Sequence, residues 1–72
     1  MIRISKHEAR KMFAQGMTFY MVAVNIHPRH ATTINKQLAS EFNNDWDKLY
    51  NAFTYYNCNW ETGYYPAYYK EP

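Results

Sequence analysis

The three histidines and the single cysteine are the residues of this sequence whose types suggest metal chemistry. His27 and His30 form an H-x-x-H pair, and His7 with Cys58 would complete a set of four zinc ligands. In the opposing interpretation His27 and His30 are solvated loop residues, and Cys58 is a small buried hydrophobic side chain. The loose spacing favours the second interpretation, so we expect no cofactor and keep the zinc site as the weaker alternative.

Cys58 is also the candidate nucleophile for covalent catalysis. Such a thiol needs a base within about 3 Å and a group that orients the base, and no known nucleophile motif surrounds Cys58. The sequence has no glycine-rich phosphate loop, and the carboxylates of Asp45 and Asp47 fall where a helix begins. We therefore expect no catalytic residues and a protein that is not an enzyme.

Tyrosine is the most conspicuous residue type, with eight copies among 72 residues, and four of them form a ladder near the end: Tyr64, Tyr65, Tyr68 and Tyr69. About half of the tyrosines are expected to fill the core of a domain that is poor in leucine and isoleucine. The others suit a protein interface, where tyrosine and tryptophan are enriched at hot spots. Stacking of nucleic-acid bases, worth about 1–3 kcal/mol per base, is the third interpretation.

The net charge of +2 conceals an uneven distribution. Residues 1–36 carry six Lys and Arg against one acidic residue, a charge of +5, and residues 37–72 carry two against five, a charge of −3. Such a dipole can steer a partner but lacks the strongly basic face of a dedicated nucleic-acid binder. The expected electrostatic contacts are Lys6, Arg10, Lys11 and Arg29.

The first half of the chain has a clear helix signature. Residues 2–4 alternate as in a short strand or extended lead-in, and Ser5 with Glu8 forms a capping box. A helix is therefore predicted over residues 6–15, with Gly16 in the left-handed position that ends it. Its apolar stripe consists of three residues: Ala9, Met12 and Phe13.

Residues 17–26 are apolar on both faces, which predicts a central strand that is covered on both sides. Residues 28–41 allow two interpretations. The spacing of Ile34, Leu38 and Phe42 suits a short helix with Thr33 as a possible cap, whereas residues 31–38 also suit a strand that pairs with the first one. Neither interpretation is favoured.

A second helix is predicted from about residue 45. Asn43 or Asn44 is expected to cap it, and two aspartates lie in its first turn, where the helix dipole favours negative charge. Its apolar stripe is Trp46, Leu49, Tyr50 and Phe53, and Asn57 and Asn59 are expected to end it. Residues 64–69 then form a strand that Pro66 restricts to an edge, or to a place where its missing donor does no harm.

These elements predict one compact α+β domain over residues 1–72, in the order helix, strand, variable segment, helix and strand. The two strands are expected to be adjacent, with both helices packed on the small sheet. A lone cysteine suits a reducing compartment, and neither a signal peptide nor an apolar run of about 20 residues is recognisable. The expected location is the cytoplasm.

Three segments resemble small uncharacterised proteins that phages and prophages of Gram-positive bacteria encode. They are ISKHEARKMFAQG, TFYMVAVNIHP and FTYYNCNWETGYYPAYY, of which YYNCNWETGYYPAYY is the most specific. The resemblance covers residues 4–28 and 45–69. In those relatives the strand often ends in a Pro-Cys pair, whereas this chain has Ala23 and Val24, which argues against a shared cysteine-based site.

The resemblance implies a setting more than a mechanism. Small phage proteins of this kind often bind and block a host defence protein, and anti-CRISPR proteins that inhibit Cas9-type nucleases are one such class. We therefore expect an inhibitor in the host bacterial cytoplasm that binds a defence protein, a Cas nuclease in particular, without a membrane. The alternative is a module that binds single-stranded nucleic acid or a nucleotide through stacked tyrosines and a basic helix.

Overall fold

The computed structural model describes residues 1–22, 31–55 and 66–72, and its architecture is the α+β class that the sequence predicts. The elements follow in the order β1 (Ile2–Ile4), α1 (Lys6–Gln15), β2 (Phe19–Val22), β3 (Thr32–Ile34), α2 (Lys36–Glu41), α3 (Trp46–Tyr55) and β4 (Ala67–Lys70). Within these ranges no helix has the length and apolar character needed to cross a membrane.

The described strands form a four-stranded sheet in the order β1-β4-β2-β3, with antiparallel pairing between every pair of neighbours. The predicted adjacency of the two strands is confirmed, because β2 pairs with β4 and Tyr20 lies opposite Tyr69. The edge position predicted as one option for the last strand is wrong, since β4 lies between β1 and β2. Pro66 precedes β4, so its missing N–H removes no ladder bond from Ala67–Lys70.

Helix α1 has the predicted bounds. The Ser5 side chain accepts a hydrogen bond from the Glu8 amide at 3.0 Å, and Gly16 has a φ of 71°. The Met17 amide donates to the Met12 carbonyl at 2.9 Å as part of this helix end. The strand predicted from residue 17 therefore begins two residues later, at Phe19. The Glu8 carboxylate, which a capping box would direct to the Ser5 amide, forms an ion pair with Lys70.

Both interpretations of the segment after residue 30 prove to be partly correct. Strand β3 pairs with β2, and helix α2 follows it directly. Thr33 lies in the strand, so the predicted cap is wrong. Asn35 caps α2 instead, because its side chain accepts from the Leu38 amide at 2.9 Å.

The units β1-α1 and β3-α2 repeat one short pattern. Each unit has a buried isoleucine, a capping side chain, a lysine and, three residues after the lysine, a buried alanine. The two sets are Ile4, Ser5, Lys6 and Ala9 in the first unit, and Ile34, Asn35, Lys36 and Ala39 in the second. In the sheet, β1 lies at one edge and β3 at the other, so the two repeated units occupy opposite edges. The remaining strands, β4 and β2, lie between them.

Helix α3 is capped by Asp45, whose side chain accepts from the Asp47 amide at 2.9 Å. The prediction that Asn43 or Asn44 caps this helix is wrong. Both asparagines have positive φ values, 57° and 54°, and turn the chain between α2 and α3. Asparagine is one of the few residue types that adopts this left-handed conformation readily.

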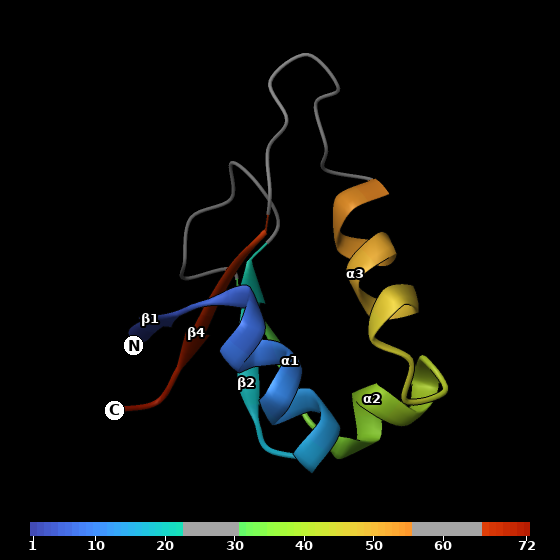
Figure 1. Cartoon of the computed structure of the whole chain (residues 1–72), viewed down its shortest axis with the longest axis horizontal. Helices are drawn as coiled ribbons and strands as arrows, with labels where there is room; N and C mark the ends of the chain where they lie inside the picture. Colours follow the sequence, from blue (N-terminus) through green and yellow to red (C-terminus); the bar gives the residue numbers. More distant parts are fainter. Residues whose placement is uncertain (23–30, 56–65) are drawn as a thin grey trace.

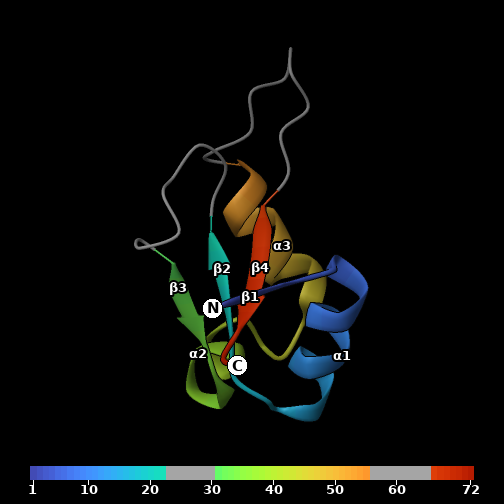
Figure 2. The ribbon, with the colours of Figure 1, turned by 90° about the vertical axis from the view of Figure 1, so that its left-hand side faces the viewer.

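The helices cover one face of the sheet, and the other face carries no described element (Figures 1 and 2). Trp46 lies at the centre of the core between the two layers. Its ring is 5.7 Å from that of Phe13, 6.4 Å from that of Phe19 and 5.9 Å from that of Tyr68. Phe19 and Leu49 have no exposed surface. Residues of α1, α3, β2 and β4 thus share one aromatic cluster.

Several predictions fall outside the described residues. They concern the end of the strand over residues 23–26, the helix end at Asn57 and Asn59, and six candidate site residues: His27, Arg29, His30, Cys58, Tyr64 and Tyr65.

Candidate functional site

The helix-free face of the sheet carries a cross-strand pair of tyrosines. Phe19, Met21 and Tyr68 point into the core, so the alternation along β2 and β4 directs Tyr20 and Tyr69 to the opposite face. Tyr20 and Tyr69 are direct neighbours across the two central strands. Both are half-buried, so each ring retains accessible surface on this face.

Arg3 extends this pair toward the β1 edge. It lies opposite Tyr69 in the ladder, and its guanidinium carbon is 5.8 Å from the centre of the Tyr69 ring. On the other side, the Tyr20 hydroxyl donates to Glu71 at 2.8 Å. The hydrogen bond to this carboxylate, with smaller effects of burial and charge repulsion, raises the pKa of Tyr20. The face therefore combines a cation, two aromatic rings and a carboxylate.

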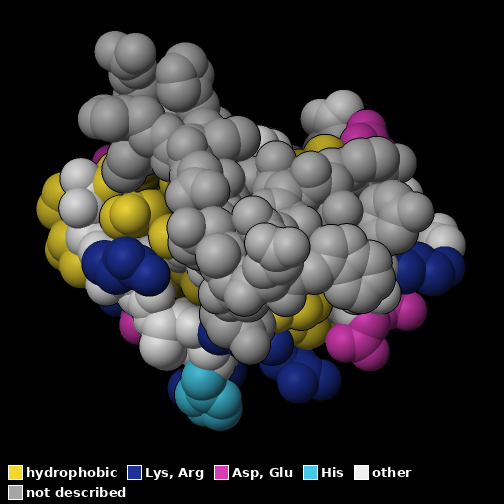
Figure 3. Space-filling model, turned by 90° about the horizontal axis from the view of Figure 1, so that it is seen from above, with side chains coloured by type: hydrophobic (Ala, Val, Ile, Leu, Met, Phe, Trp, Pro, Cys, Tyr) yellow, Lys and Arg dark blue, Asp and Glu magenta, His cyan; other side chains and the backbone are white. Residues whose placement is uncertain are grey.

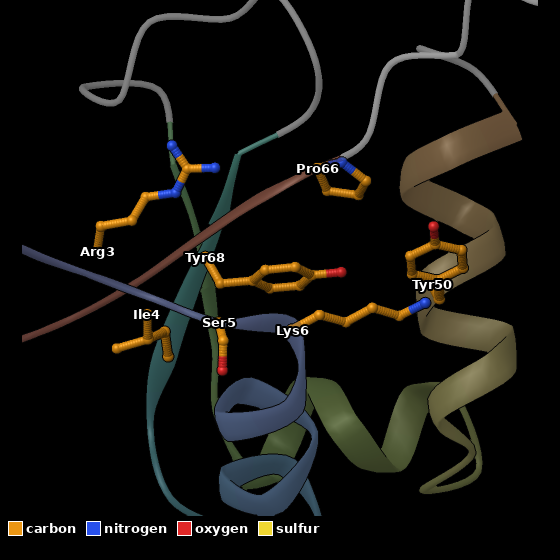
Figure 4. Close-up of a pocket in the computed structure, with 7 residues that line it drawn as sticks. All are labelled: Arg3, Ile4, Ser5, Lys6, Tyr50, Pro66 and Tyr68. Atoms are coloured by element: carbon orange, nitrogen blue, oxygen red, sulfur yellow. The ribbon is translucent and has the colours of Figure 1, made fainter.

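A pocket opens at the same edge but on the helix side of the sheet (Figure 4). Its volume is about 320 Å³, near the lower end of the range for small-molecule sites. It is lined by the end of β1, the start of α1, α3 and the start of β4, through Arg3, Ile4, Ser5, Lys6, Tyr50, Pro66 and Tyr68. Segments far apart in sequence therefore build it.

Lys6 spans this pocket from the first position of α1. Its ammonium nitrogen lies 4.0 Å from the centre of the Tyr50 ring, a cation–π contact worth about 1 kcal/mol. The side chain is exposed, so it can change rotamer without disturbing the core. Figure 4 shows the lysine chain passing below the Tyr68 ring toward Tyr50.

Tyr68 forms the inner wall of the pocket. Only 4% of its surface is exposed, and its hydroxyl oxygen is buried without a hydrogen-bond partner among the described residues. Burial, with a smaller effect of Tyr50, raises the pKa of this phenol. The hydroxyl therefore stays protonated at neutral pH and is a donor without an acceptor in the described part of the chain.

The structure brings only part of the predicted site together. Lys6 and Tyr68 line the pocket, Tyr69 lies on the helix-free face, and Arg10 and Lys11 are exposed farther along α1. Viewed from above, lysine and arginine side chains gather beside a histidine along one margin of the molecule (Figure 3). Arg29, Tyr64 and Tyr65 lie outside the described residues.

Sequence reasoning missed Arg3, Tyr20 and Tyr50 as site residues. The sequence places Arg3 in the short extended segment before the first helix and Tyr20 in the strand predicted over residues 17–26. It places Tyr50 in the apolar stripe of the second helix. The signal that could have found Arg3 and Tyr20 is their outward phase in the strand alternation. Nothing in the sequence distinguishes Tyr50 from its buried neighbours, because its role depends on the approach of Lys6.

The predicted alternative zinc site is not assembled in the part of the chain that the structure describes. Over residues 1–22, 31–55 and 66–72, no three His, Cys, Asp or Glu side chains are grouped closely enough to hold a metal ion. His7 is an exposed residue of α1. The other three proposed ligands fall within the undescribed ranges.

Comparison with known proteins adds no relative: no family model, no curated protein and no solved structure matches the chain.

Proposed function

We propose that the protein acts by stoichiometric binding to a bacterial defence protein, which it inhibits, and that the target is a Cas nuclease. The observation that carries the binding proposal is the pairing of a cation with an aromatic ring on each side of the β1 edge. Arg3 lies over Tyr69 on one side, and Lys6 lies over Tyr50 on the other. The choice of target rests on the resemblance to phage proteins.

Such pairs suit a protein interface for physical reasons. Arginine and tyrosine are enriched among interface hot spots, because they bury a large apolar area and still offer polar groups. Here each cation already contacts a ring, which favours one of its rotamers and lowers the side-chain entropy lost on binding. The positive half of the chain would also speed association with an acidic surface.

The test is a binding and cleavage assay with a purified Cas9-type nuclease from a Gram-positive host. We expect a 1:1 complex, inhibition of DNA cleavage, and a loss of affinity of at least about tenfold for Arg3→Glu and for Lys6→Glu, each introduced singly. Lys48→Glu is the matched control, because Lys48 is exposed on α3 and lies about 200° around the helix from Tyr50.

Failure of this proposal has a clear form. The nuclease would not bind, cleavage would proceed at the uninhibited rate, and expression of the protein would give no rescue of phage in a plaque assay. Equal loss of affinity in the Lys48→Glu control would show that net charge, not the β1 edge, determines binding.

The second candidate is binding of single-stranded nucleic acid or a nucleotide to the helix-free face. The observation in its favour is the Tyr20–Tyr69 pair on the two central strands, because aromatic residues in such positions of a four-stranded sheet can stack bases. Glu71 beside Tyr20 would repel phosphate, which places this function second.

Fluorescence titration with single-stranded DNA, RNA and cyclic nucleotides separates the two functions. If the face binds bases, quenching saturates and weakens with salt. Tyr69→Leu then lowers affinity about tenfold, whereas Tyr69→Phe retains it, because stacking needs the ring and not the hydroxyl. Absence of saturable quenching would eliminate this candidate.

A further inference from the structure

The pocket beside Lys6 contains a buried hydrogen-bond donor that has no acceptor among the described residues. The Tyr68 hydroxyl is buried and has no partner among the described residues. The Lys6 ammonium faces the Tyr50 ring at 4.0 Å, and no carboxylate is among the residues that line the pocket. A buried donor that lost its water on folding and gained no acceptor is costly, so an acceptor supplied from outside would stabilise this arrangement.

The end of α1 adds to the preference for an anion. Ser5 and Lys6, its cap and first residue, both line the pocket. The N-terminus of a ten-residue helix carries a partial positive charge of roughly half a unit, because its first amides have no partner within the helix. The helix end, the ammonium and the phenol therefore favour the same ligand charge.

The number of charges selects the kind of anion. One lysine balances the single charge of a carboxylate, whereas the second charge of a phosphate would remain uncompensated in a partly buried site. Arg3 lines the pocket, but its guanidinium does not supply the second charge, since it is placed over the Tyr69 ring on the other face of the sheet. Figure 4 shows it directed away from Tyr68 and Lys6.

The walls indicate what must be attached to that carboxylate. Ile4, Pro66 and the faces of two tyrosine rings give the pocket a mainly apolar lining, which suits methylene groups. We infer that the pocket binds a glutamate side chain of the target protein, with the carboxylate between Lys6 Nζ and Tyr68 Oη. That the glutamate belongs to an inhibited target rests on the proposed function, whereas the chemistry of the pocket does not.

The first test uses the full chain and a short blocked peptide, acetyl-Gly-Glu-Gly-amide. NMR titration is expected to give saturable shifts of the Lys6 side-chain and Tyr68 ring signals. The matching glutamine peptide and inorganic phosphate are expected to bind at least about tenfold more weakly. The glutamine side chain lacks the negative charge, and the second negative charge of phosphate remains uncompensated in the pocket. Equal binding of the glutamine peptide, tighter binding of phosphate, or no shift with the glutamate peptide would overturn the inference.

The second test uses variants of the two donors. Tyr68→Phe and Lys6→Met keep most of the side-chain volume and are each expected to weaken binding of the glutamate peptide about tenfold, the loss of one charge-assisted hydrogen bond. Lys48→Met, on the far side of α3, is expected to leave it unchanged. Circular dichroism melts confirm that each variant is folded, and unchanged peptide affinity in both folded pocket variants would overturn the inference.

The two proposals fail in different ways. If the glutamate peptide binds and no Cas nuclease does, the pocket assignment holds and the proposed target is wrong. If the nuclease binds wild type and both pocket variants equally, and the peptide gives no shifts, the pocket assignment is wrong and the inhibitor function holds.

Discussion

At the residue scale, Tyr68 is the least satisfied group of the described structure. Its ring belongs to the core and contacts Trp46, while its hydroxyl is buried in the pocket wall without a partner. Ring and hydroxyl therefore contribute with opposite sign to the free energy of folding.

The first prediction separates these two contributions. Tyr68→Phe is expected to leave the free energy of unfolding unchanged or to raise it by about 1 kcal/mol, because an unpaired buried donor is removed. Tyr68→Ala is expected to lower it by about 3 kcal/mol or more through lost packing. Urea denaturation measures both, and a clear loss of stability in Tyr68→Phe would mean that the hydroxyl has a partner.

The second prediction concerns alkaline pH. Burial raises the pKa of Tyr68 above the ordinary value of about 10 that it has in the unfolded chain. Above pH 10 the unfolded chain therefore releases this proton first, and stability falls as pH rises. Stability measured by urea at pH 9 to 11.5 should fall less steeply in Tyr68→Phe, and parallel curves for the two proteins would contradict the assignment.

At the element scale, the units β1-α1 and β3-α2 each join an edge strand to a capped helix. Each unit buries an isoleucine and an alanine on either side of a capping residue, and the caps have nearly equal hydrogen bonds of 3.0 and 2.9 Å. The same solution at both edges places α1 and α2 on one face of the sheet (Figure 2).

The third prediction tests the equivalence of the caps. Ser5→Ala and Asn35→Ala are each expected to lower the free energy of unfolding by about 1 kcal/mol, because one amide of each helix loses its acceptor. Asn35→Ser should retain most of the stability as the matched control. Thermal melts measure these changes, and unchanged stability in both alanine variants would mean that solvent satisfies the amides equally well.

At the scale of the whole molecule, one aromatic cluster joins the helices to the sheet. Trp46 stacks with Tyr50 of its own helix and contacts α1, β2 and β4 through Phe13, Phe19 and Tyr68. A domain of 72 residues buries only roughly 60% of its unfolded surface, so it has little core to spare. The same packing places Tyr50 opposite Lys6.

The fourth prediction follows from this central position. Trp46→Ala is expected to cost about 3–5 kcal/mol, a large part of the roughly 4–11 kcal/mol that a chain of this length has. The Trp46→Ala variant should either lose its cooperative thermal transition or unfold at a much lower midpoint temperature. Trp46→Phe should retain a cooperative transition. Far-ultraviolet circular dichroism followed with temperature records the loss, and a Trp46→Ala variant with a wild-type melt would contradict the central role.

The predictions made from sequence succeeded where the deciding contacts are local. The bounds of α1 follow from Ser5 and Gly16, which act within three or four residues of their partners. The competing interpretations around residues 31–41 could not be separated, because a three-residue strand and a six-residue helix each give too short a pattern. The cap of α3 was missed because three polar residues in succession, Asn43, Asn44 and Asp45, are all suitable.

The sequence by itself determined the α+β class, the extent of α1, the buried stripes of α1 and α3, and the central place of β2. Only the tertiary structure decided that β4 is central, that β1 and β3 form the edges, and that Lys6, Tyr50 and Tyr68 meet in one pocket. The physical reason is the separation along the sequence of the residues that interact. Helix caps and periodic burial depend on neighbours in sequence, whereas strand pairing and the pocket depend on contacts between residues far apart in the chain, up to the 68 positions that separate Ile2 from its strand partner Lys70.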